Sequence, residues 1–266
     1  QEKQIDNNIV EKLSQKKSIS QIFAKLLLSR GIDEENIDEF LNPDITAQIP
    51  NPFVLKDMKK GVDRCLIALK NKEKIGIIAD YDVDGSTSAS ILFKFLNNYS
   101  SNIICKIPNR LSDGYGPNHR LMNEMLEDNV KLLFTLDCGT SAFNIIDHPD
   151  YNSIEVIVID HHIPDIKLPP AYAIINPKRI DTEKGYEDLC AAGVTFIFLI
   201  GLNRELRKQG YFKNRAEPNL FQFLDLVALG TVCDVVPLSK LNRALVKQGL
   251  NIMKRRENIG IKVLSD

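Results

Sequence analysis

No run of about 18 consecutive apolar residues occurs in this 266-residue chain, so no transmembrane helix is expected. The amino end, residues 1–6, is polar and lacks the apolar core of a secretory signal peptide. It also lacks an initiator Met, and we expect the chain to be a fragment of a longer protein. Hydrophobic residues make up 44% of the chain and charged residues 26%, which is typical of a soluble globular protein.

Cysteine is scarce, and its pattern excludes two kinds of scaffold. The five cysteines are odd in number, widely spaced and form no CxxC pair, which argues against a disulfide framework or a structural zinc site and fits a reducing cytosol. They are Cys65, Cys105, Cys138, Cys190 and Cys233. Cys138 and Cys233 neighbour candidate metal-binding aspartates. Either they are soft metal ligands, or they are small buried residues beside the site, and we favour the second interpretation.

A strong charge of either sign is also missing. The net charge is −1, so the chain has no global basic signature of nucleic-acid binding. Metal ions bound to several aspartates would change the local field, which matters more than the total charge. No internal repeat is present, and no GxGxxG follows an expected strand, which argues against a dinucleotide-binding module.

The chain begins with an expected α-helical leader, residues 1–48. Apolar residues with helical spacing predict a helix from Ser18 to Phe40, interrupted at Gly31, and a short helix over Asp33–Leu41 that Asn42-Pro43 ends. An amphipathic helix is expected at Asp57–Lys70. It opens the remaining part, residues 49–266, which we expect to be the catalytic domain.

From Lys74 onward, strand and helix patterns alternate, which favours a doubly wound α/β fold. The strands are rich in β-branched residues without polar alternation, as expected for a mostly parallel sheet that is buried on both faces. We expect strands at residues 75–79, 103–107, 132–136, 155–159 and 172–175. We expect helices at residues 86–97, 118–128, 141–147, 191–208, 220–230 and 241–254.

Four clusters with acidic residues each follow a hydrophobic run. They are Asp80-Tyr81-Asp82-Val83-Asp84-Gly85, Asp137-Cys138-Gly139-Thr140, Asp160-His161-His162 and Gly230-Thr231-Val232-Cys233-Asp234. The carboxyl ends of parallel strands form one edge of a sheet, where ligands bind. Carboxylates gathered there would repel one another unless cations were bound between them. The clusters therefore predict the lining of a two-metal phosphoesterase site.

The first cluster permits two interpretations. In extended backbone, residues two apart face the same side, so the strand would present Asp80, Asp82 and Asp84 in a line. Gly85 permits a tight turn, and Ser86 opens the next helix, whose free N–H groups suit phosphate. The alternative is an acidic loop in which Asp84 caps the helix.

The other clusters also have alternatives. Asp137 is either a metal ligand or an N-cap, and Asp234 is either a ligand or a cap or salt-bridge partner. The pair His161-His162 brings imidazole to the rim beside Asp160, which suits manganese or another transition ion, whereas the alternative is a solvated loop. His119 and His148 are lone histidines in loop or helix contexts, and His148 is expected at the plain surface.

The segment Ile107–Pro117 follows an expected strand and contains two glycines. Its Arg110 has a fork of donors that suits a phosphate. The alternative is a long glycine-rich connection with a surface arginine.

In order and spacing, the clusters resemble the four motifs of the DHH phosphoesterase superfamily. The Asp-Tyr-Asp-Val-Asp-Gly form, the Ile-Pro-Asn-Arg and Gly-Tyr-Gly stretch and the Val-Val-Pro-Leu after Asp234 are similar to its RecJ-like branch. The resemblance spans residues 50–260, and the helical leader is similar as well. The family's second α/β domain, DHHA1, and the OB-fold of the RecJ-like branch do not occur within this sequence.

The resemblance implies a set of metal ligands around two Mn²⁺ or Mg²⁺ ions. One ion would be held by Asp82, Asp137 and Asp234, and the other by Asp84, Asp137 and His161, with Asp137 bridging. Asp80 would stand near the first ion. Many relatives carry a histidine where this chain has Ile78, a departure that puts the first ligand set in doubt.

The resemblance also implies roles for the remaining residues. Asp160 would orient an imidazole, His162 would contact the scissile phosphate, and Arg110 would bind the substrate's phosphate. Ser86, at the expected start of a helix, is a further candidate for binding the substrate. The residues expected to carry catalysis are Asp160, His161 and His162.

The implied protein is a cytoplasmic 5′-to-3′ exonuclease that acts on single-stranded DNA in repair and recombination and releases 5′-mononucleotides. Expected partners are single-stranded DNA and, for the full-length protein, a single-strand-binding protein and a helicase, with no membrane. Two alternatives stay open. One is a DHH hydrolase of short oligonucleotides, cyclic dinucleotides or pyrophosphate, against which Ile78 counts. The other is a non-catalytic replication scaffold, against which the other ligands count.

Overall fold

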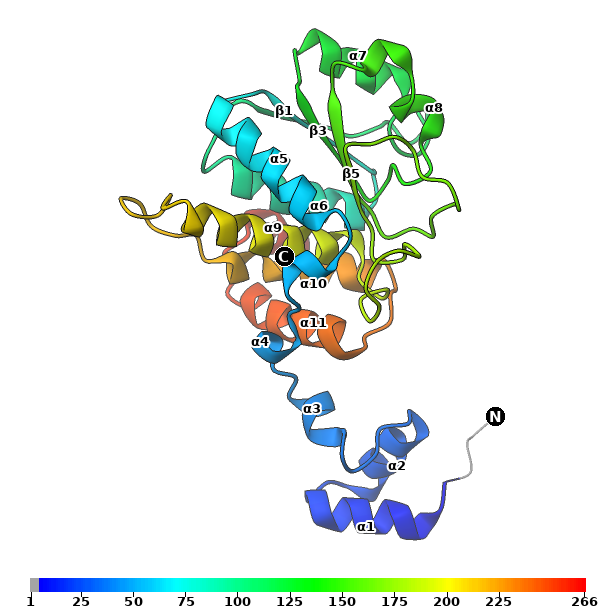
Figure 1. The fold of residues 1–266 in the computed structure, drawn as a ribbon. Helices are drawn as coiled ribbons and strands as arrows, with labels where there is room; N and C mark the ends of the chain where they lie inside the picture. The colour runs from blue at the N-terminus through cyan, green and yellow to red at the C-terminus, as the bar shows by residue number, and fades with distance from the viewer. Residues whose placement is uncertain (1–4) are drawn as a thin grey trace. The chain divides into compact units, whose positions relative to one another are not determined.

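The computed structural model describes residues 5–266, so residues 1–4 of the polar amino end lie outside it (Figure 1). The chain divides into two units, one that ends at Gln48 and one from Ile49 to Asp266. The first is a small helical unit with α1 (Asn7–Lys17), α2 (Gln21–Ser29), α3 (Ile37–Leu41) and α4 (Ile45–Gln48). Its own core contains Val10, Leu13, Ala24, Leu27 and Ile37.

The helices of the first unit differ from the prediction at their boundaries. Ser18 does not begin a helix. It lies in left-handed backbone with φ 51° and ends α1, which the sequence pattern did not reveal. Helix α2 starts after Ser20, whose side chain accepts a hydrogen bond from the Phe23 N–H. Helix α3 starts at Ile37 rather than at Asp33, whose carboxylate instead accepts from backbone N–H groups in the preceding turn.

The second unit is built on a five-stranded parallel sheet in the order β2-β1-β3-β4-β5. The strands are β1 (Ile75–Ala79), β2 (Ile103–Lys106), β3 (Leu132–Leu136), β4 (Glu155–Ile159) and β5 (Ala173–Ile175). All four neighbouring pairs run parallel. Strands β1 and β3 are buried along their whole length, as their unbroken apolar sequences predict. The predicted α/β fold with a mostly parallel sheet is confirmed.

Helices cover both faces of the sheet (Figure 1). On one face, α5 (Met58–Asn71) and α9 (Ala191–Lys208) pack on β4 and β5. There Gly61 lies against Ile157, Ile175 and Phe198. Helix α6 (Val83–Leu96) packs on β1 and on α9.

The opposite face is covered by α7 (His119–Glu127), with α8 (Phe143–Ile146) and the short 3₁₀ helix η2 (Pro149–Tyr151) beside it. The core on this face includes Ile78, Leu121, Met125, Leu133 and Val158. The two helical layers leave the carboxyl edge of the strands as the place where loops and helix ends meet.

The chain continues as the 3₁₀ helix η3 (Leu220–Phe223), α10 (Leu224–Cys233), α11 (Lys240–Met253) and α12 (Ile259–Ser265). Another 3₁₀ helix, η1 (Pro52–Val54), precedes α5. Helices α10 and α11 approach closely at Gly249, where a Cβ atom would lie 2.1 Å from the Leu224 carbonyl oxygen. Only glycine permits this contact, which fixes α10 against α11.

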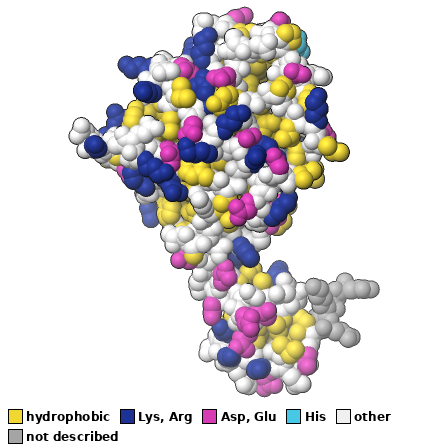
Figure 2. Space-filling view, viewed as in Figure 1, with side chains coloured by type: hydrophobic (Ala, Val, Ile, Leu, Met, Phe, Trp, Pro, Cys, Tyr) yellow, Lys and Arg dark blue, Asp and Glu magenta, His cyan; other side chains and the backbone are white. Residues whose placement is uncertain are grey.

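Within the described residues, no helix combines the length and the hydropathy needed to cross a lipid bilayer. Figure 2 shows Lys and Arg side chains interspersed with acidic and apolar ones on the visible face. This mixture agrees with the net charge of −1.

Candidate metal centre

Three aspartates follow three adjacent strands in the same position, each one residue beyond its strand. The backbone N–H of Asp80 donates to the Leu136 carbonyl at 3.1 Å, and that of Asp137 donates to the Ile159 carbonyl at 3.0 Å. The N–H of Asp160 likewise donates to the Ile175 carbonyl at 3.1 Å. The parallel hydrogen-bond pattern therefore extends one residue past the strands and brings these aspartates to one edge of the sheet.

Asp82 and Asp84 reach this edge from a helix rather than from an extended strand, contrary to the expected line of carboxylates. Strand β1 ends at Ala79, and α6 begins at Val83, three residues before the predicted start. Asp82 is the N-cap of α6, and its Oδ1 accepts from the Gly85 N–H at 2.9 Å. The alternative that assigned this cap to Asp84 is thus wrong.

Asp84 instead caps a helix that is distant in the sequence. Its Oδ2 accepts from the Ala191 N–H at 2.6 Å and its Oδ1 from the Ala192 N–H at 2.9 Å, at the start of α9. Gly85 is required beside it, because a Cβ atom there would lie 2.4 Å from the Asp80 carbonyl oxygen. The first turn of α6 can therefore pass close to the backbone after β1, and Asp84 reaches the first residues of α9.

Asp234 approaches from the end of a helix. The predicted helix over residues 220–230 is the 3₁₀ helix η3 followed by α10, and Asp234 is the C-cap of α10. The next residue, Val235, has φ 59°, a left-handed conformation that is unfavourable for a β-branched side chain. This sharp turn ends α10 with the Asp234 carboxylate directed at the strand ends.

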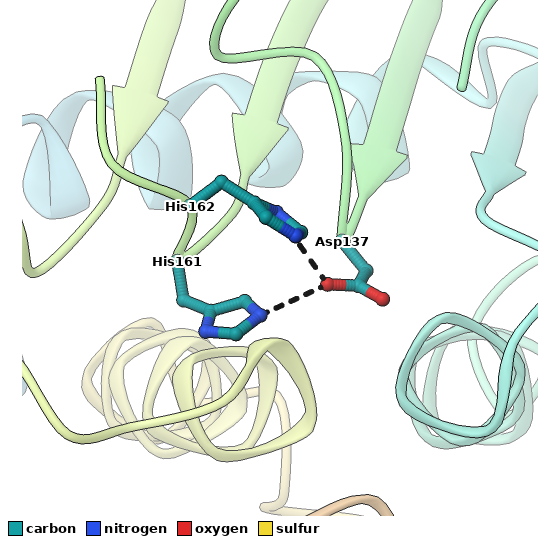
Figure 3. A group of neighbouring side chains, drawn as sticks. All are labelled: Asp137, His161 and His162. Carbon is teal, nitrogen blue, oxygen red and sulfur yellow. Dashed lines mark ion pairs between the residues drawn. The ribbon is translucent and has the colours of Figure 1, made fainter. Parts of the chain in front are cut away.

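The His161 imidazole lies among three carboxylates. Its Nε2 is 3.2 Å from Asp137 Oδ1, 3.5 Å from Asp234 Oδ2 and 3.6 Å from Asp84 Oδ2. Figure 3 shows His161 and His162 both directed at the Asp137 carboxylate from the loop after β4. His162 Nδ1 is 3.9 Å from Asp137 Oδ1. Asp137 is therefore the central carboxylate of the site.

Three groups of side chains have ligand atoms within 4.8 Å of one another. They are Asp137 with His161 and His162, Asp84 with His161 and Asp234, and Asp80 with Asp82 and Asp137. Asp137 and His161 each belong to two groups, so the groups overlap, and a carboxylate such as that of Asp137 can bind two adjacent cations. All six residues expected to bind metal are in these groups, although in other combinations than the resemblance implied.

Several buried atoms of this site have no hydrogen-bond partner within the described residues. They are Asp80 Oδ1, Asp137 Oδ1 and both ring nitrogens of His161. Buried polar atoms without partners are rare in folded proteins unless an ion or water satisfies them. Carboxylate oxygens and imidazole nitrogen are ligands for manganese. The residues present therefore fit divalent cations.

The protonation behaviour of the site agrees with this fit. Burial raises the pKa of Asp137, and the charges of Asp84 and Asp82 raise it further. Burial also raises the pKa of Asp84 and of Asp234. The pKa of His161 is lowered to about 4, mainly by burial, so its imidazole is neutral near neutral pH. Without cations, these carboxylates resist ionising together.

Asp160 holds the loop after β4 in place. Its Oδ1 accepts from the backbone N–H groups of His161 and His162 at 2.7 and 3.1 Å, and it lies 2.7 Å from His162 Nδ1. Its Oδ2 accepts from the Thr140 N–H at 3.0 Å. Burial opposes the ionised form, but the bonds from His162 and Thr140 keep the pKa of Asp160 below its usual range. The hydrogen bond to Asp160 in turn raises the pKa of His162.

The expected phosphate-binding residues lie at the surface. Arg110 is exposed, and its guanidinium carbon is 5.5 Å from the centre of the Tyr81 ring. This contact brings Arg110 beside the segment that carries Asp80 and Asp82. Ser86 is exposed on α6, outside the three ligand groups.

The cysteines and the other two histidines lie outside these groups. Cys138 is buried, as expected, whereas Cys233 is exposed. His119 opens α7 and His148 precedes η2, which agrees with the expected helix and loop contexts. They are not isolated, however, because their rings pack with centres 5.0 Å apart. His119 Nδ1 is also 2.8 Å from the Tyr151 hydroxyl.

Two polar residues that sequence reasoning did not assign also belong to the site. The Tyr115 hydroxyl donates to the Asp137 carbonyl at 2.6 Å and lies 3.2 Å from His162 Nδ1. Asn176, which follows β5, donates from its amide to the His162 carbonyl at 2.9 Å. The available signals were a tyrosine between two glycines and a polar residue at a fifth strand end.

A model of the DHH family, N-terminal domain, matches residues 74–231. The chain belongs to the DHH family. Among its relatives, the single-stranded-DNA-specific exonuclease RecJ of Bacillus subtilis (strain 168) is 32% identical over 97% of this chain and 31% of its own length. RecJ of Escherichia coli (strain K12) is 38% identical over 91% of this chain and 42% of its own length. This DHH chain thus spans less than half of these relatives.

Solved structures of RecJ proteins are also similar to this chain. The crystal structure of an exonuclease RecJ bound to manganese matches this DHH chain with a TM-score of 0.69 at 33% identity, covering 79% of this chain and 51% of the other. RecJ from Thermus thermophilus in complex with Mn²⁺ matches with a TM-score of 0.76 at 27% identity, covering 98% and 36%. The resemblance to the DHH family that the motifs predicted is confirmed.

Proposed function

We propose that this chain is the catalytic part of a RecJ-type, single-stranded-DNA-specific 5′-to-3′ exonuclease that uses two Mn²⁺ or Mg²⁺ ions and releases 5′-mononucleotides. The observation that carries the proposal is the sharing of Asp137 and His161 among three ligand groups at one sheet edge. The names of the similar RecJ exonucleases and the manganese in their structures support it. All candidate ligands lie in the unit from Ile49 to Asp266, which we therefore propose as the catalytic domain, with residues 1–48 as its helical leader.

Bound divalent cations would lower the pKa of a water molecule and neutralise charge on a phosphodiester. The residues proposed to hold them are Asp80, Asp82, Asp84, Asp137, His161 and Asp234, with Asp137 bridging. The neutral imidazole of His161 offers a free nitrogen for this task. The carboxylates that resist ionising together would ionise fully beside cations.

The remaining residues would bind and orient the substrate. His162 is half exposed, and its hydrogen bond to Asp160 favours the protonated ring, which can donate to a non-bridging phosphate oxygen. Arg110, which follows β2, would bind phosphate from the β2 side with the fork of N–H donors of its guanidinium group. Ser86, near the start of α6, would contact the substrate as well.

A cavity of about 500 Å³ adjoins His162 and gives room for the rest of a nucleotide. It lies between the loops after β2 and β3, and Tyr115, Phe143 and Asp160 line it. Aromatic walls beside a phosphate-binding residue suit a sugar and base, because bases stack on aromatic rings without regard to sequence. The cavity thus supports a nucleic-acid substrate over inorganic pyrophosphate.

The decisive experiment incubates the purified chain with Mn²⁺ and 5′-labelled single-stranded DNA, with matched duplex DNA and dinucleotides as competing substrates. We expect labelled 5′-mononucleotides from the single strand only. The variant Asp137→Asn keeps the side-chain volume but removes a negative charge, and we expect it to be inactive. Preferred hydrolysis of dinucleotides would favour the short-oligonucleotide alternative, and full activity of Asp137→Asn would remove the bridging role.

Ile78 argues against that alternative. It occupies the position where many relatives carry a histidine, and here it is buried in the core on the α7 face. As part of the same proposal, the full-length protein acts in the cytoplasm in DNA repair and recombination. There it would meet a single-strand-binding protein and a helicase.

A further inference from the structure

One strand end at the carboxyl edge has no part in the proposed function. Strand β5 is followed by Asn176-Pro177-Lys178, which we call the β5 arm. The Asp160 N–H donates to the carbonyl of Ile175, the last residue of β5. The β5 arm therefore starts beside the loop that carries His161 and His162.

Asn176 fixes the β5 arm to the metal centre. Its side chain is fully buried, and its amide nitrogen donates to the His162 carbonyl at 2.9 Å and to the Thr140 hydroxyl at 3.1 Å. Its Oδ1 accepts from the backbone N–H of Lys178 at 2.8 Å. One amide group thus connects the loops after β3 and β4 to the backbone of Lys178.

The ammonium group of Lys178 has no hydrogen bond or ion pair with any residue from 5 to 266, although the side chain is half-buried. The Asn176 amide alone separates the backbone of Lys178 from the carbonyl of His162, a distance that a lysine side chain can span. Lys178 therefore lies at the same edge of the sheet as the metal centre.

The order of the strands gives Lys178 a cationic counterpart, Arg110, at the other edge of the sheet. Candidate metal ligands follow or flank the inner strands β1, β3 and β4, whereas Arg110 follows the edge strand β2. Lys178 follows the other edge strand, β5. A phosphodiester is negatively charged, so cationic side chains on both flanks of this row of carboxylates would stabilise it there.

We propose that Lys178 is a phosphate-binding residue of this site, which contacts a non-bridging oxygen of the substrate from the β5 side while Arg110 does so from the β2 side. Asn176 positions Lys178 through its backbone. The inference rests on the proposed function for the identity of the phosphodiester. The substrate-binding surface would then include the end of β5, with Lys178 as its second flanking cation.

The test compares Lys178→Ala, Lys178→Arg and the control Lys131→Ala. Lys131 is exposed and directly precedes β3, so it lies at the opposite, amino edge of the sheet. Calorimetry measures the affinity for Mn²⁺, and then that of the Mn²⁺-loaded protein for thymidine 5′-monophosphate. A charge-assisted hydrogen bond of about 1.5–3 kcal/mol corresponds to an affinity for the nucleotide about 10-fold or more weaker in Lys178→Ala.

We expect Lys178→Ala to keep the Mn²⁺ affinity of the unaltered chain, Lys178→Arg to recover most of the nucleotide affinity, and Lys131→Ala to change neither. The proposal is overturned if Lys178→Ala binds the nucleotide as well as the unaltered chain does. It is also overturned if Mn²⁺ affinity falls in parallel, or if the Mn²⁺-loaded unaltered chain does not bind the nucleotide. If that chain binds Mn²⁺ and nucleotide but leaves single-stranded DNA intact, the exonuclease proposal fails while the assignment of Lys178 stands.

Discussion

The hydroxyl of Tyr115 donates a 2.6 Å hydrogen bond to the backbone carbonyl of Asp137, and its ring meets the His162 ring edge-on with centres 5.7 Å apart. Asp137 needs this support, because its backbone is left-handed with φ 60°. Burial and the charge of Asp160 raise the pKa of Tyr115, so the hydroxyl keeps its proton and donates. A residue from the loop after β2 thus helps to hold the central carboxylate in an unfavourable conformation.

Replacing Tyr115 by Phe should lower kcat for a single-stranded oligonucleotide by about 5- to 10-fold, the value of one neutral hydrogen bond of about 1 kcal/mol. KM should change less, because the ring and its packing on His162 remain. Steady-state kinetics with Mn²⁺ measure both values. Tyr172→Phe is the control, since the Tyr172 ring packs under Lys60 away from Asp137. Equal kcat for Tyr115→Phe and the unaltered chain would contradict the supporting role.

Asn176→Asp should destabilise the fold. The new carboxylate oxygen would face the His162 carbonyl and the Thr140 hydroxyl, so at least one buried donor is lost. We expect the free energy of unfolding to fall by about 1–3 kcal/mol, as for a buried group left unsatisfied. Urea denaturation with and without Mn²⁺ measures the change. The exposed Asn152→Asp serves as the matched control, and an identical midpoint for both variants would refute the expectation.

Mn²⁺ affinity should rise with pH. In the metal-free protein the pKa of Asp84 is raised to about 6, mainly by burial, and the pKa of Asp137 is raised as well. Cations compete with these protons, so binding at pH 6 releases protons and becomes tighter as the pH rises through the raised pKa values. His161 does not oppose this trend above pH 5, because its pKa is lowered to about 4. Calorimetry at pH 6 in two buffers of different ionisation enthalpy counts the released protons. Equal heats in both buffers would show that the carboxylates are already ionised.

Gly249→Ala should disturb the site from a distance. The added methyl group would lie 2.1 Å from the Leu224 carbonyl oxygen and 2.5 Å from the Ala228 Cβ, so α10 must move away from α11. We expect a loss of about 1–3 kcal/mol of stability by overpacking, together with weaker Mn²⁺ binding, because Asp234 ends α10. Thermal unfolding and Mn²⁺ titration measure these effects. In the control, Gly260→Ala, the added methyl meets nothing nearer than 3.5 Å, and it should be neutral or stabilising.

The sequence predicted the strands well because they carry a strong local signal. Ile75–Ala79 and Leu132–Leu136 are runs of apolar residues that only a sheet covered on both faces can bury, and their bounds agree with the structure. Helix α1 was missed because only Val10 and Leu13 of its residues are buried, which leaves too weak an apolar stripe for detection.

The residues of the site that directly follow strands could be predicted from the sequence. Asp80, Asp137 and Asp160 occupy equivalent positions after parallel strands, a relationship that one rule about sheet edges anticipates. The hydrogen bond from the Ala191 N–H to Asp84 joins positions more than a hundred residues apart, so no local sequence pattern predicts it. The contact of Asn176 with His162 is likewise tertiary.

The double task of Asp84 restricts which residue can stand at its position. Both of its oxygens already accept bonds from the first turn of α9, and Oδ2 also lies 3.6 Å from His161 Nε2. A glutamate would carry the same charge, but its longer arm would reach past either the helix or the cation. Side-chain length, rather than acidity alone, therefore decides the identity of this residue, because one carboxylate serves both the start of α9 and the candidate metal centre.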